Sequence, residues 1–250
     1  MKLDRVIAVR NRKTVFRDGD KCIKVFGPSY TKADVLNEAL NQARIEETGL
    51  NIPEILELTR IDGKWAIVSR YIEGKTLQRI MDEEKENKFD LMNGFVNLQM
   101  EIHAKSCPLL NRQKEAMNMQ IIKCNLDATM RYDLHARLES MSGQNRICHG
   151  DFRPSNIIID KENKPYILDW SHATQGNPSA DAARTYLLFW MEGRISAADR
   201  YLEIFTKKSG ITETEIRKWM PIVAAAESIR GNEKEREFLL SWVREMDNVR

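Results

Sequence analysis

The segment richest in reactive side chains runs from His149 to Asn156 and reads His-Gly-Asp-Phe-Arg-Pro-Ser-Asn. A second carboxylate, Asp169, follows after an aliphatic run and a turn, and directly precedes Trp170. Carboxylates can accept protons, and with amide oxygens they are ligands for hard cations such as Mg²⁺. A lone Asp-x-x-x-x-Asn is common by chance, and the alternative here is a surface β-hairpin with solvated acids. The longer pattern is much rarer and indicates a catalytic site.

This longer pattern resembles the catalytic loop and metal-binding aspartate of kinases, in the form used by the aminoglycoside phosphotransferase and choline kinase families. By this resemblance Asp151 is the base that accepts the proton of an acceptor hydroxyl. Asn156 and Asp169 are the expected ligands of magnesium that bridges the nucleotide phosphates. Arg153 is expected to neutralise charge on the γ-phosphate in the transition state, and a plain surface arginine is the alternative.

Other polar residues near the motif are expected to support the loop and not to react. His149 is interpreted as a scaffold for the loop rather than a proton shuttle. Asp181 resembles a family aspartate that supports the catalytic loop. His103 and the five tryptophans are interpreted as core or surface packing residues.

Lys24 and Glu38 form the second candidate pair. Lys24 lies in the middle of a β-rich run and resembles the lysine of the third kinase strand, which grips the α- and β-phosphates, although a strand lysine usually faces solvent. Glu38 is the expected ionic partner, because about 100° per residue puts it on one helical face with Val35 and Ile45. The alternatives are a solvated Glu38, or Glu46–Glu47 as partners from the far end of the helix.

The segment from Ile67 to Gly74 resembles the hinge between kinase lobes. By analogy, the carbonyl of Arg70 and the N–H of Ile72 would face the edge of the purine. Adenine recognition of this kind uses backbone groups, so side chains report it poorly. An ordinary strand that ends at a glycine turn is the alternative.

Two departures from the protein-kinase pattern favour a small-molecule kinase. Residues 1–18 contain no glycine, so a turn at residues 10–13 would have to replace the glycine-rich phosphate loop, with Arg12 and Lys13 available to meet phosphate. Only eleven residues separate Asp169 from Asp181, which leaves no room for a phosphorylatable activation segment.

The elements that must position these residues follow from local patterns. Two hairpins are expected, one around Asp18–Asp20 and one around Asp62–Gly63, with a helix between them. Thr31 opens that helix, with Asp34 as a near capping box, and one side of it carries Leu36, Ala39, Leu40 and Ala43. A pair of short strands is expected within residues 147–170, and helices elsewhere after Thr76.

Together these elements predict an α+β, bilobal protein-kinase-like fold. Residues 1–73 are the expected nucleotide-binding lobe, which is small and β-rich with one helix. Residues 74–250 are the expected catalytic and substrate-binding lobe, which is larger and mainly helical.

The composition limits the class of protein further. Of the 250 residues, 42% are apolar, which suffices for a core, and no run approaches the ~20 apolar residues of a membrane helix. The N-terminus has no signal-peptide core, so we expect a cytoplasmic protein. A net charge of +2 recruits neither nucleic acid nor anionic lipid. The four cysteines are scattered, which disfavours structural zinc and predicts free thiols.

The sequence therefore predicts an ATP-dependent phosphotransferase, with GTP as an alternative donor, that acts with Mg²⁺ on a hydroxyl of a small metabolite or antibiotic. Residues 192–250 hold eleven acidic and eleven Lys or Arg side chains, so no excess of acid indicates a polycationic acceptor. Choline-like, sugar-like, amino-alcohol and macrolide acceptors stay open. The rival interpretations are a catalytically idle nucleotide-binding module and a protein kinase.

Overall fold

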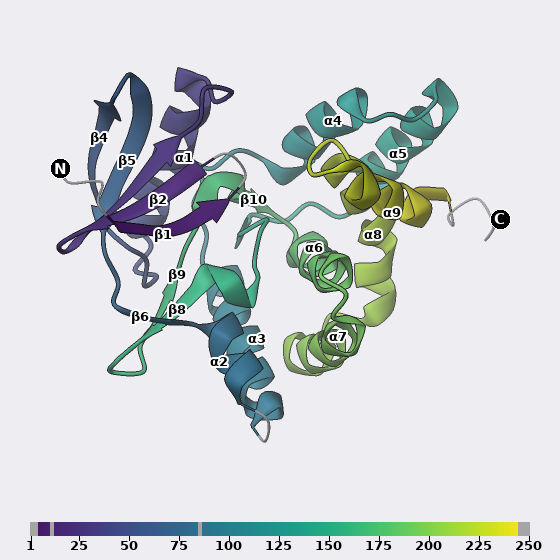
Figure 1. The fold of residues 1–250 in the computed structure, drawn as a ribbon. Helices are drawn as coiled ribbons and strands as arrows, with labels where there is room; N and C mark the ends of the chain where they lie inside the picture. Colours follow the sequence, from purple (N-terminus) through teal and green to yellow (C-terminus); the bar gives the residue numbers. More distant parts are fainter. Residues whose placement is uncertain (1–4, 11–12, 85–86, 245–250) are drawn as a thin grey trace. The chain divides into compact units, whose positions relative to one another are not determined.

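The computed structural model describes residues 5–10, 13–84 and 87–244. Two compact units make up the chain: residues 1–85 with 154–172, and residues 86–153 with 173–250 (Figure 1). This grouping follows the density of packing. The expected division of the chain at residue 73 is a division by function and stays a prediction.

An antiparallel five-stranded sheet with strand order β1-β2-β3-β5-β4 forms much of the first unit. Its strands are β1 (Arg5–Arg10), β2 (Lys13–Asp18), β3 (Lys21–Phe26), β4 (Ile55–Ile61) and β5 (Lys64–Arg70). Both expected hairpins are therefore present. Asp62 and Gly63 connect β4 to β5 with φ values of 49° and 76°, the left-handed conformation that an Asp-Gly hairpin turn requires.

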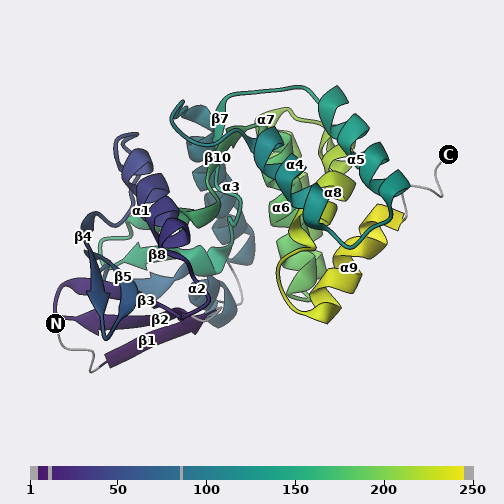
Figure 2. The same cartoon turned by 90° about the horizontal axis from the view of Figure 1, so that it is seen from above.

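Helix α1 (Lys32–Glu46) covers one face of this sheet (Figure 2). It begins at a capping box in which the side chains of Thr31 and Asp34 each accept a hydrogen bond from the other's backbone N–H. The expected N-terminus of the helix is thus confirmed. Glu38 lies on its buried face and is only 5% exposed.

The predicted apolar side of α1 is wrong in part. Leu36 and Leu40 are 41% and 48% exposed, whereas Val35 and Ala39 are buried against the sheet. The two leucines lie about 100° around the helix from those residues. The buried face is therefore set by its fit to the sheet, and it includes a carboxylate that side-chain hydrophobicity alone would place outside.

A smaller three-stranded sheet completes the first unit with strand order β6-β8-β9. Its strands are β6 (Gly74–Thr76), β8 (Ile157–Asp160) and β9 (Pro165–Ile167), and helix α2 (Leu77–Glu83) follows β6. The predicted pair of short strands corresponds to β8 and β9. A Cβ on Gly74 would lie 2.1 Å from the carbonyl oxygen of Ile159, so only glycine fits at this crossing.

The second unit is mainly helical, as expected for the later part of the chain. Its helices are α3 (Lys88–Ala104), α4 (Gln113–Lys123), α5 (Ala128–Ser140), α6 (Pro178–Met191), α7 (Ile195–Ser209), α8 (Glu213–Glu227) and α9 (Glu233–Arg244). A two-stranded sheet joins β7 (Arg146–Cys148) to β10 (Thr174–Gly176). Helix α6 is buried along nearly its whole length and packs against α7 and α8.

Aromatic packing anchors the predicted catalytic loop in the second unit. Phe152, the residue after Asp151, is fully buried and stacks on Phe95 with ring centroids 4.5 Å apart. Phe189 and Tyr201 pack edge-on against the same Phe95 ring. A buried aromatic next to the predicted base restricts the freedom of the loop.

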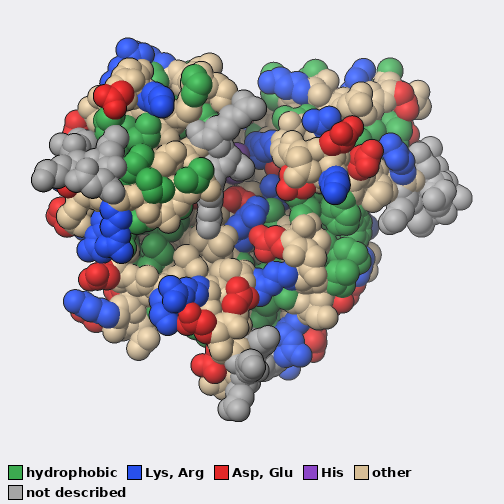
Figure 3. Space-filling model, viewed as in Figure 1, with side chains coloured by type: hydrophobic (Ala, Val, Ile, Leu, Met, Phe, Trp, Pro, Cys, Tyr) green, Lys and Arg blue, Asp and Glu red, His purple; other side chains and the backbone are tan. Residues whose placement is uncertain are grey.

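Figure 3 shows acidic and basic side chains interspersed on the face in view. None of the helices that the structure describes is long and apolar enough to cross a membrane.

Candidate active site

A cavity of about 320 Å³ lies within the first unit. The sheet, helix α1 and the segments after β5 and β9 contribute its walls. All six residues that the sequence predicts for nucleotide and metal binding line it: Lys24, Glu38, Arg70, Ile72, Asn156 and Asp169. Sequence positions far apart are thus brought to one concave site, which is the usual form of a small-molecule binding site.

Lys24 is held between two carboxylates at the wall of this cavity. Its Nζ lies 2.7 Å from Glu38 Oε1 and 3.6 Å from Asp169 Oδ1. Burial alone would lower the pKa of Lys24, but the charges of Asp169 and Glu38 outweigh burial and raise the pKa above its ordinary value. The contact expected between Lys24 and Glu38 is present. Of the two competing acids, Glu46 instead accepts a hydrogen bond from the Ile55 N–H, and Glu47 is exposed.

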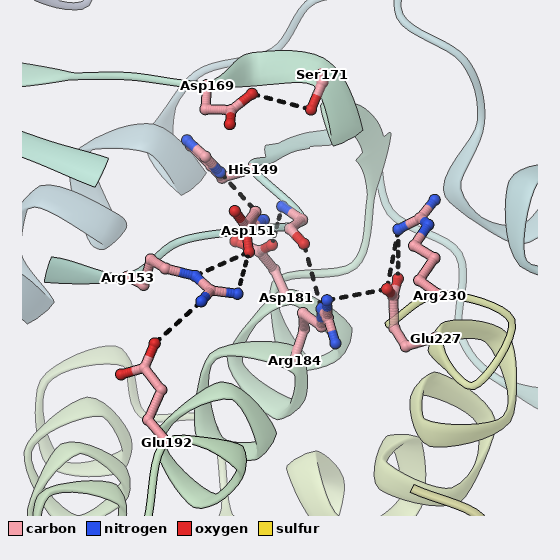
Figure 4. A network of polar contacts seen from close by, with 11 residues as sticks. His149, Asp151, Arg153, Asp169, Ser171, Asp181, Arg184, Glu192, Glu227 and Arg230 are labelled. Carbon is pink, nitrogen blue, oxygen red and sulfur yellow. Dashed lines mark hydrogen bonds and ion pairs between the residues drawn. The ribbon is translucent and has the colours of Figure 1, made fainter. Parts of the chain in front are cut away.

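Asp169 stays ionised in this setting. Burial alone would raise its pKa, but the positive charges of Lys24 and Lys13 outweigh burial and hold the pKa well below its usual range. The backbone at Asp169 is left-handed with φ of 61°, which is uncommon for a residue other than glycine. Its Oδ1 accepts a hydrogen bond of 3.0 Å from Ser171 Oγ (Figure 4). An acid in an unusual backbone conformation at a cavity is a typical functional residue.

The backbone brings Asn156 next to Asp169. The Leu168 N–H donates to the Asn156 carbonyl at 2.8 Å, and this bond extends the β8–β9 pairing by one step. The donor set is therefore a carboxylate and a carboxamide, which are hard oxygen ligands that suit Mg²⁺. Among the described residues no group of three or more His, Cys, Asp or Glu forms a metal cage. Magnesium bound by few protein ligands and completed by phosphates fits this arrangement.

At the expected hinge, the Arg70 side chain is occupied by acidic partners, so the predicted contact with a purine falls to backbone groups. The Arg70 guanidinium is half exposed and pairs with Glu54 at 3.1 Å and Asp20 at 3.7 Å. The Tyr71 N–H donates to the Asp20 carbonyl at 2.7 Å. By contrast, the Ile72 N–H makes no hydrogen bond within the described part of the chain. It is thus available to a ligand.

Of the turn expected to replace the glycine-rich loop, Asn11 and Arg12 lie outside the described residues. Lys13 is described and lines the cavity. Its Nζ donates to Glu38 Oε2 at 2.7 Å, so Glu38 binds two lysines at once. Sequence reasoning paired Glu38 with Lys24 alone.

Asp151 and Arg153 belong to the second unit, where the loop that carries them is held by several hydrogen bonds. Gly150, which has φ of 76°, donates its N–H to Asp181 Oδ1 at 2.7 Å. The Asp151 N–H donates to His149 Nδ1 at 3.1 Å (Figure 4). His149 is fully buried and fits the scaffold role expected for it. These bonds fix the backbone at Gly150 and at the predicted base itself.

Asp181 is the buried anchor of that loop. Besides Gly150, it binds Gln99 Nε2 at 3.2 Å and His103 Nε2 at 2.9 Å. Burial alone would raise the pKa of Asp181, but the hydrogen bond and charge of His103 outweigh burial and lower the pKa. The sequence interpretation of His103 as a packing residue missed this bond. Two polar residues four positions apart, Gln99 and His103, on one face of a helix are the signal that would have found it.

Arg153 bridges two carboxylates. Its Nη2 and Nε lie 2.7 Å and 3.0 Å from Asp151 Oδ1, and its Nη1 lies 3.0 Å from Glu192 Oε1 (Figure 4). Arg153 is therefore not a plain surface arginine. Glu192, at the C-terminal end of α6, had no local signal in the sequence, because its partner is 39 positions away.

A buried ion-pair chain holds the same loop from the other side. Arg184 Nε lies 3.4 Å from the Gly150 carbonyl oxygen, and its Nη2 lies 2.9 Å from Glu227 Oε2. Arg230 Nη1 binds both oxygens of Glu227 at 2.9 Å. Figure 4 shows this chain running from the loop through α6 to the end of α8. Sequence reasoning missed Arg184 and Glu227.

The cavity with its lysines and carboxylates and the α+β architecture are those expected of a phosphotransferase of the protein-kinase-like fold. Comparison with known families gives the same class of protein and narrows it to one family. Residues 7–219 match the model of the phosphotransferase enzyme family, and the chain belongs to that family. No curated protein matches the chain in sequence.

Solved structures of similar fold agree with this assignment. The choline kinase LicA from Streptococcus pneumoniae is similar with a TM-score of 0.67 and 15% identity over 98% of this chain and 92% of the other. The aminoglycoside phosphotransferase APH(4)-Ia, as a thermostable mutant, has a TM-score of 0.71 and 16% identity over 96% and 92%. A complex of such a mutant with ADP and hygromycin B has a TM-score of 0.69 and 14% identity over 96% and 91%. At these identities the likeness establishes the protein-kinase-like fold.

Proposed function

We propose that this protein transfers the γ-phosphate of ATP to a hydroxyl group of a small molecule. The observation that carries the proposal is the convergence of Lys24, Glu38, Asn156 and Asp169 on one cavity. Phosphoryl transfer depends on the positioning and charge stabilisation of a polyphosphate, and these are the side chains that supply both. ATP is favoured over GTP because the structures of similar fold include complexes with ADP and with AMP-PNP.

On the nucleotide side, each residue has a separate task. Lys24 binds the α- and β-phosphates, and Glu38 keeps the ammonium in place. The Ile72 N–H and the Arg70 carbonyl receive the edge of the adenine. Asn156 and Asp169 would hold magnesium, which would offset the negative charge of the phosphates.

On the acceptor side, Asp151 takes the proton from the attacking hydroxyl. Arg153 orients the Asp151 carboxylate through two hydrogen bonds and adds positive charge where negative charge grows during transfer. The bonds from Asp181 and His149 to the loop backbone keep Asp151 in a fixed position. A fixed base and an aligned hydroxyl are the main sources of rate in this chemistry.

The acceptor is proposed to be a small molecule because the solved structures of similar fold include a choline kinase and a hygromycin B complex. The test is an acceptor panel with Mg-ATP, which includes choline, amino alcohols, sugars, macrolides and aminoglycosides. ADP release and a mass increase of the acceptor by one phosphoryl group are the expected results. The matched control is Asp169→Asn, which should release no ADP. A wild-type protein that binds no Mg-ATP by calorimetry would refute the proposal.

A further inference from the structure

Glu38 offers one negative charge to two lysines. Lys24 donates to its Oε1 and Lys13 to its Oε2, each at 2.7 Å. Both lysines line the cavity, and they come from different strands, β3 and β2. Only one of the two ammonium groups is needed to balance the charge of Glu38, so the three groups together carry one excess positive charge.

Lys13 is also fixed in an unusual way for a lysine. Its side chain is 13% exposed, and its Nζ lies 5.1 Å and 5.2 Å from the ring centroids of Phe26 and Tyr30. Lysines are mostly exposed and flexible. Two aromatic faces and a buried carboxylate hold this ammonium at the cavity wall.

The charge of the cluster points to an anionic ligand. Asp169 is the other acid beside Lys24, and in the proposed function it is directed to Mg²⁺. Lys13, Lys24 and Glu38 then remain with a net charge of +1 next to the metal ligands. A phosphate group satisfies such a cluster through charge-assisted hydrogen bonds.

The sequence of the β1–β2 hairpin gives a reason for this lysine. Residues 1–18 contain no glycine, so the hairpin lacks the residue type that lets backbone N–H groups approach phosphates closely. Lys13 is the first residue of β2 and pairs with Arg10, the last residue of β1. It supplies a positive side chain where a glycine-rich loop would supply backbone donors.

We infer that Lys13 is a second phosphate-binding residue of the nucleotide site and that its ligand is the β- or γ-phosphate of a nucleoside di- or triphosphate. The inference rests on the proposed function. Glu38 holds the two ammonium groups in fixed positions, so that neighbouring phosphate oxygens meet two cations at once. The competing role is that of a counter-ion that merely neutralises buried Glu38.

The test compares Lys13→Met, which keeps the stem and loses the charge, with Lys13→Arg, which keeps the charge. Calorimetry with Mg-ATP, Mg-ADP and adenosine is the measurement. We expect Lys13→Met to weaken Mg-ATP and Mg-ADP by about 10- to 100-fold, the range for a charged hydrogen bond. Adenosine should stay within about 2-fold, because it has no phosphate. Lys13→Arg should recover part of the Mg-ATP affinity.

The matched control is Lys32→Met. Lys32 also lies over an aromatic ring, with its Nζ 5.7 Å from the Trp65 centroid, but it does not line the cavity. Its loss should leave all three affinities unchanged. A Lys13→Met protein that melts at a lower temperature but keeps the wild-type ratio of Mg-ATP to adenosine affinity would show the counter-ion role and overturn the inference.

A second measurement uses the wild-type protein and does not depend on the folding of a variant. The rate of acetylation of Lys13 is followed by mass spectrometry with Mg-ATP, with adenosine and without ligand, and Lys32 is the internal reference. Protection of Lys13 by Mg-ATP but not by adenosine is expected. Equal acetylation with both ligands, in a protein shown to bind Mg-ATP, overturns the inference and leaves the proposed function intact.

Discussion

Asp151 and Asp169 are both aspartates, but their surroundings differ. Asp169 lies 3.6 Å from Lys24 and keeps a depressed pKa, so its charge is permanent near neutral pH. Asp151 Oδ1 accepts hydrogen bonds from the guanidinium of Arg153, and the loop backbone is held at Gly150 and Asp151. A permanent charge suits a cation ligand, and a tethered carboxylate suits a proton acceptor.

These settings predict separable effects of two isosteric substitutions. Asp151→Asn should lower turnover by roughly 10²- to 10⁴-fold, the contribution of a positioned base, and leave the Mg-ATP dissociation constant within a few-fold. Asp169→Asn should weaken the binding of Mg-ATP, because a metal ligand loses its charge. Calorimetry beside turnover on an identified acceptor is the measurement. Near-normal turnover of Asp151→Asn would remove Asp151 from the catalytic role.

The depressed pKa of Asp169 also predicts a pH dependence of stability. A carboxylate with a lowered folded-state pKa stabilises the protein above its ordinary pKa of about 3.9, and this contribution is lost as the pH falls toward the folded-state pKa. The difference in unfolding free energy between wild type and Asp169→Asn should be constant near neutral pH and shrink below about pH 4. Denaturant unfolding across this range measures it. Asp62→Asn, at an exposed residue that does not line the cavity, is the control.

The pairing of Lys24 with Glu38 predicts non-additive losses. Lys24→Ala removes a phosphate contact directly, whereas Glu38→Ala acts by releasing Lys24. The double variant should therefore lose less Mg-ATP affinity than the sum of the single losses. Glu47→Ala, at an exposed residue next to the C-terminal end of α1, is the matched control and should be additive with Lys24→Ala. Additivity of Lys24 and Glu38 would show that Glu38 does not work through Lys24.

At the scale of elements, α6 holds the predicted catalytic loop through the two backbone polar groups of Gly150, its N–H and its carbonyl. Asp181 accepts the Gly150 N–H and Arg184 donates to the Gly150 carbonyl, and the two side chains are three positions apart on one helical face. Glu227 at the end of α8 binds Arg184 in turn. The position of the loop therefore depends on two helices distant in sequence.

This arrangement predicts that exchanging the charges of Arg184 and Glu227 separates stability from turnover. Arg184→Met should lower turnover by about 10- to 100-fold through misplacement of the loop, and it should also destabilise the fold by leaving Glu227 with less compensation. The double variant Arg184→Glu with Glu227→Arg should recover only part of the unfolding free energy, because an ion pair is restored while the new guanidinium at position 227 faces Arg230. It should not recover turnover, because a carboxylate cannot donate to the Gly150 carbonyl.

The control for this exchange is the Glu213–Arg217 pair, an exposed ion pair on the same α8. Reversing its charges should change neither stability nor turnover by much, since exposed pairs contribute little. Recovery of turnover by the Arg184 and Glu227 exchange would show that their ion pair alone matters, and not the bond to Gly150.

Local signals predicted the elements well, and long-range contacts were where prediction failed. The Asp62–Gly63 turn and the Thr31 cap each depend on a few adjacent residues, and both are present as expected. Leu36 and Leu40 were misplaced because the sheet selects which face of α1 is buried. The same limit applies to the site. The family pattern pointed to residues that the structure places at one cavity, such as Lys24 and Asp169, but His103, Glu192 and Glu227 meet partners far away in the sequence.

At the scale of the whole molecule, the eight-residue motif continues from one compact unit into the other. Asp151 and Arg153 belong to the second unit, whereas Asn156 belongs to the first, with Lys24 and Asp169. The proposed nucleotide ligands thus all lie in the first unit. Binding of Mg-ATP should therefore be measurable even when the acceptor is unknown.

The melting temperature is the corresponding whole-molecule measurement. Mg-ATP at about 100 times its dissociation constant should add about 2.7 kcal/mol to stability. ATP with a chelator should raise the melting temperature less, because Asn156 and Asp169 contact the nucleotide through the metal. Asp169→Asn should abolish the difference between the two conditions. A melting curve indifferent to both nucleotide and metal would contradict the phosphotransferase proposal.

Positions within the expected hinge, from Ile67 to Gly74, should differ widely in the replacements that they tolerate. The Arg70 side chain pairs with Glu54 and Asp20, and the contact that we expect of Arg70 and Ile72 with adenine is made by their backbone groups. In a saturation library selected for function, many replacements at Arg70 should survive. At Gly74, where a Cβ would lie 2.1 Å from a carbonyl oxygen, almost none should. Positions of this stretch whose side chains do not shape its backbone, such as Arg70, can thus vary while the expected recognition of adenine stays the same.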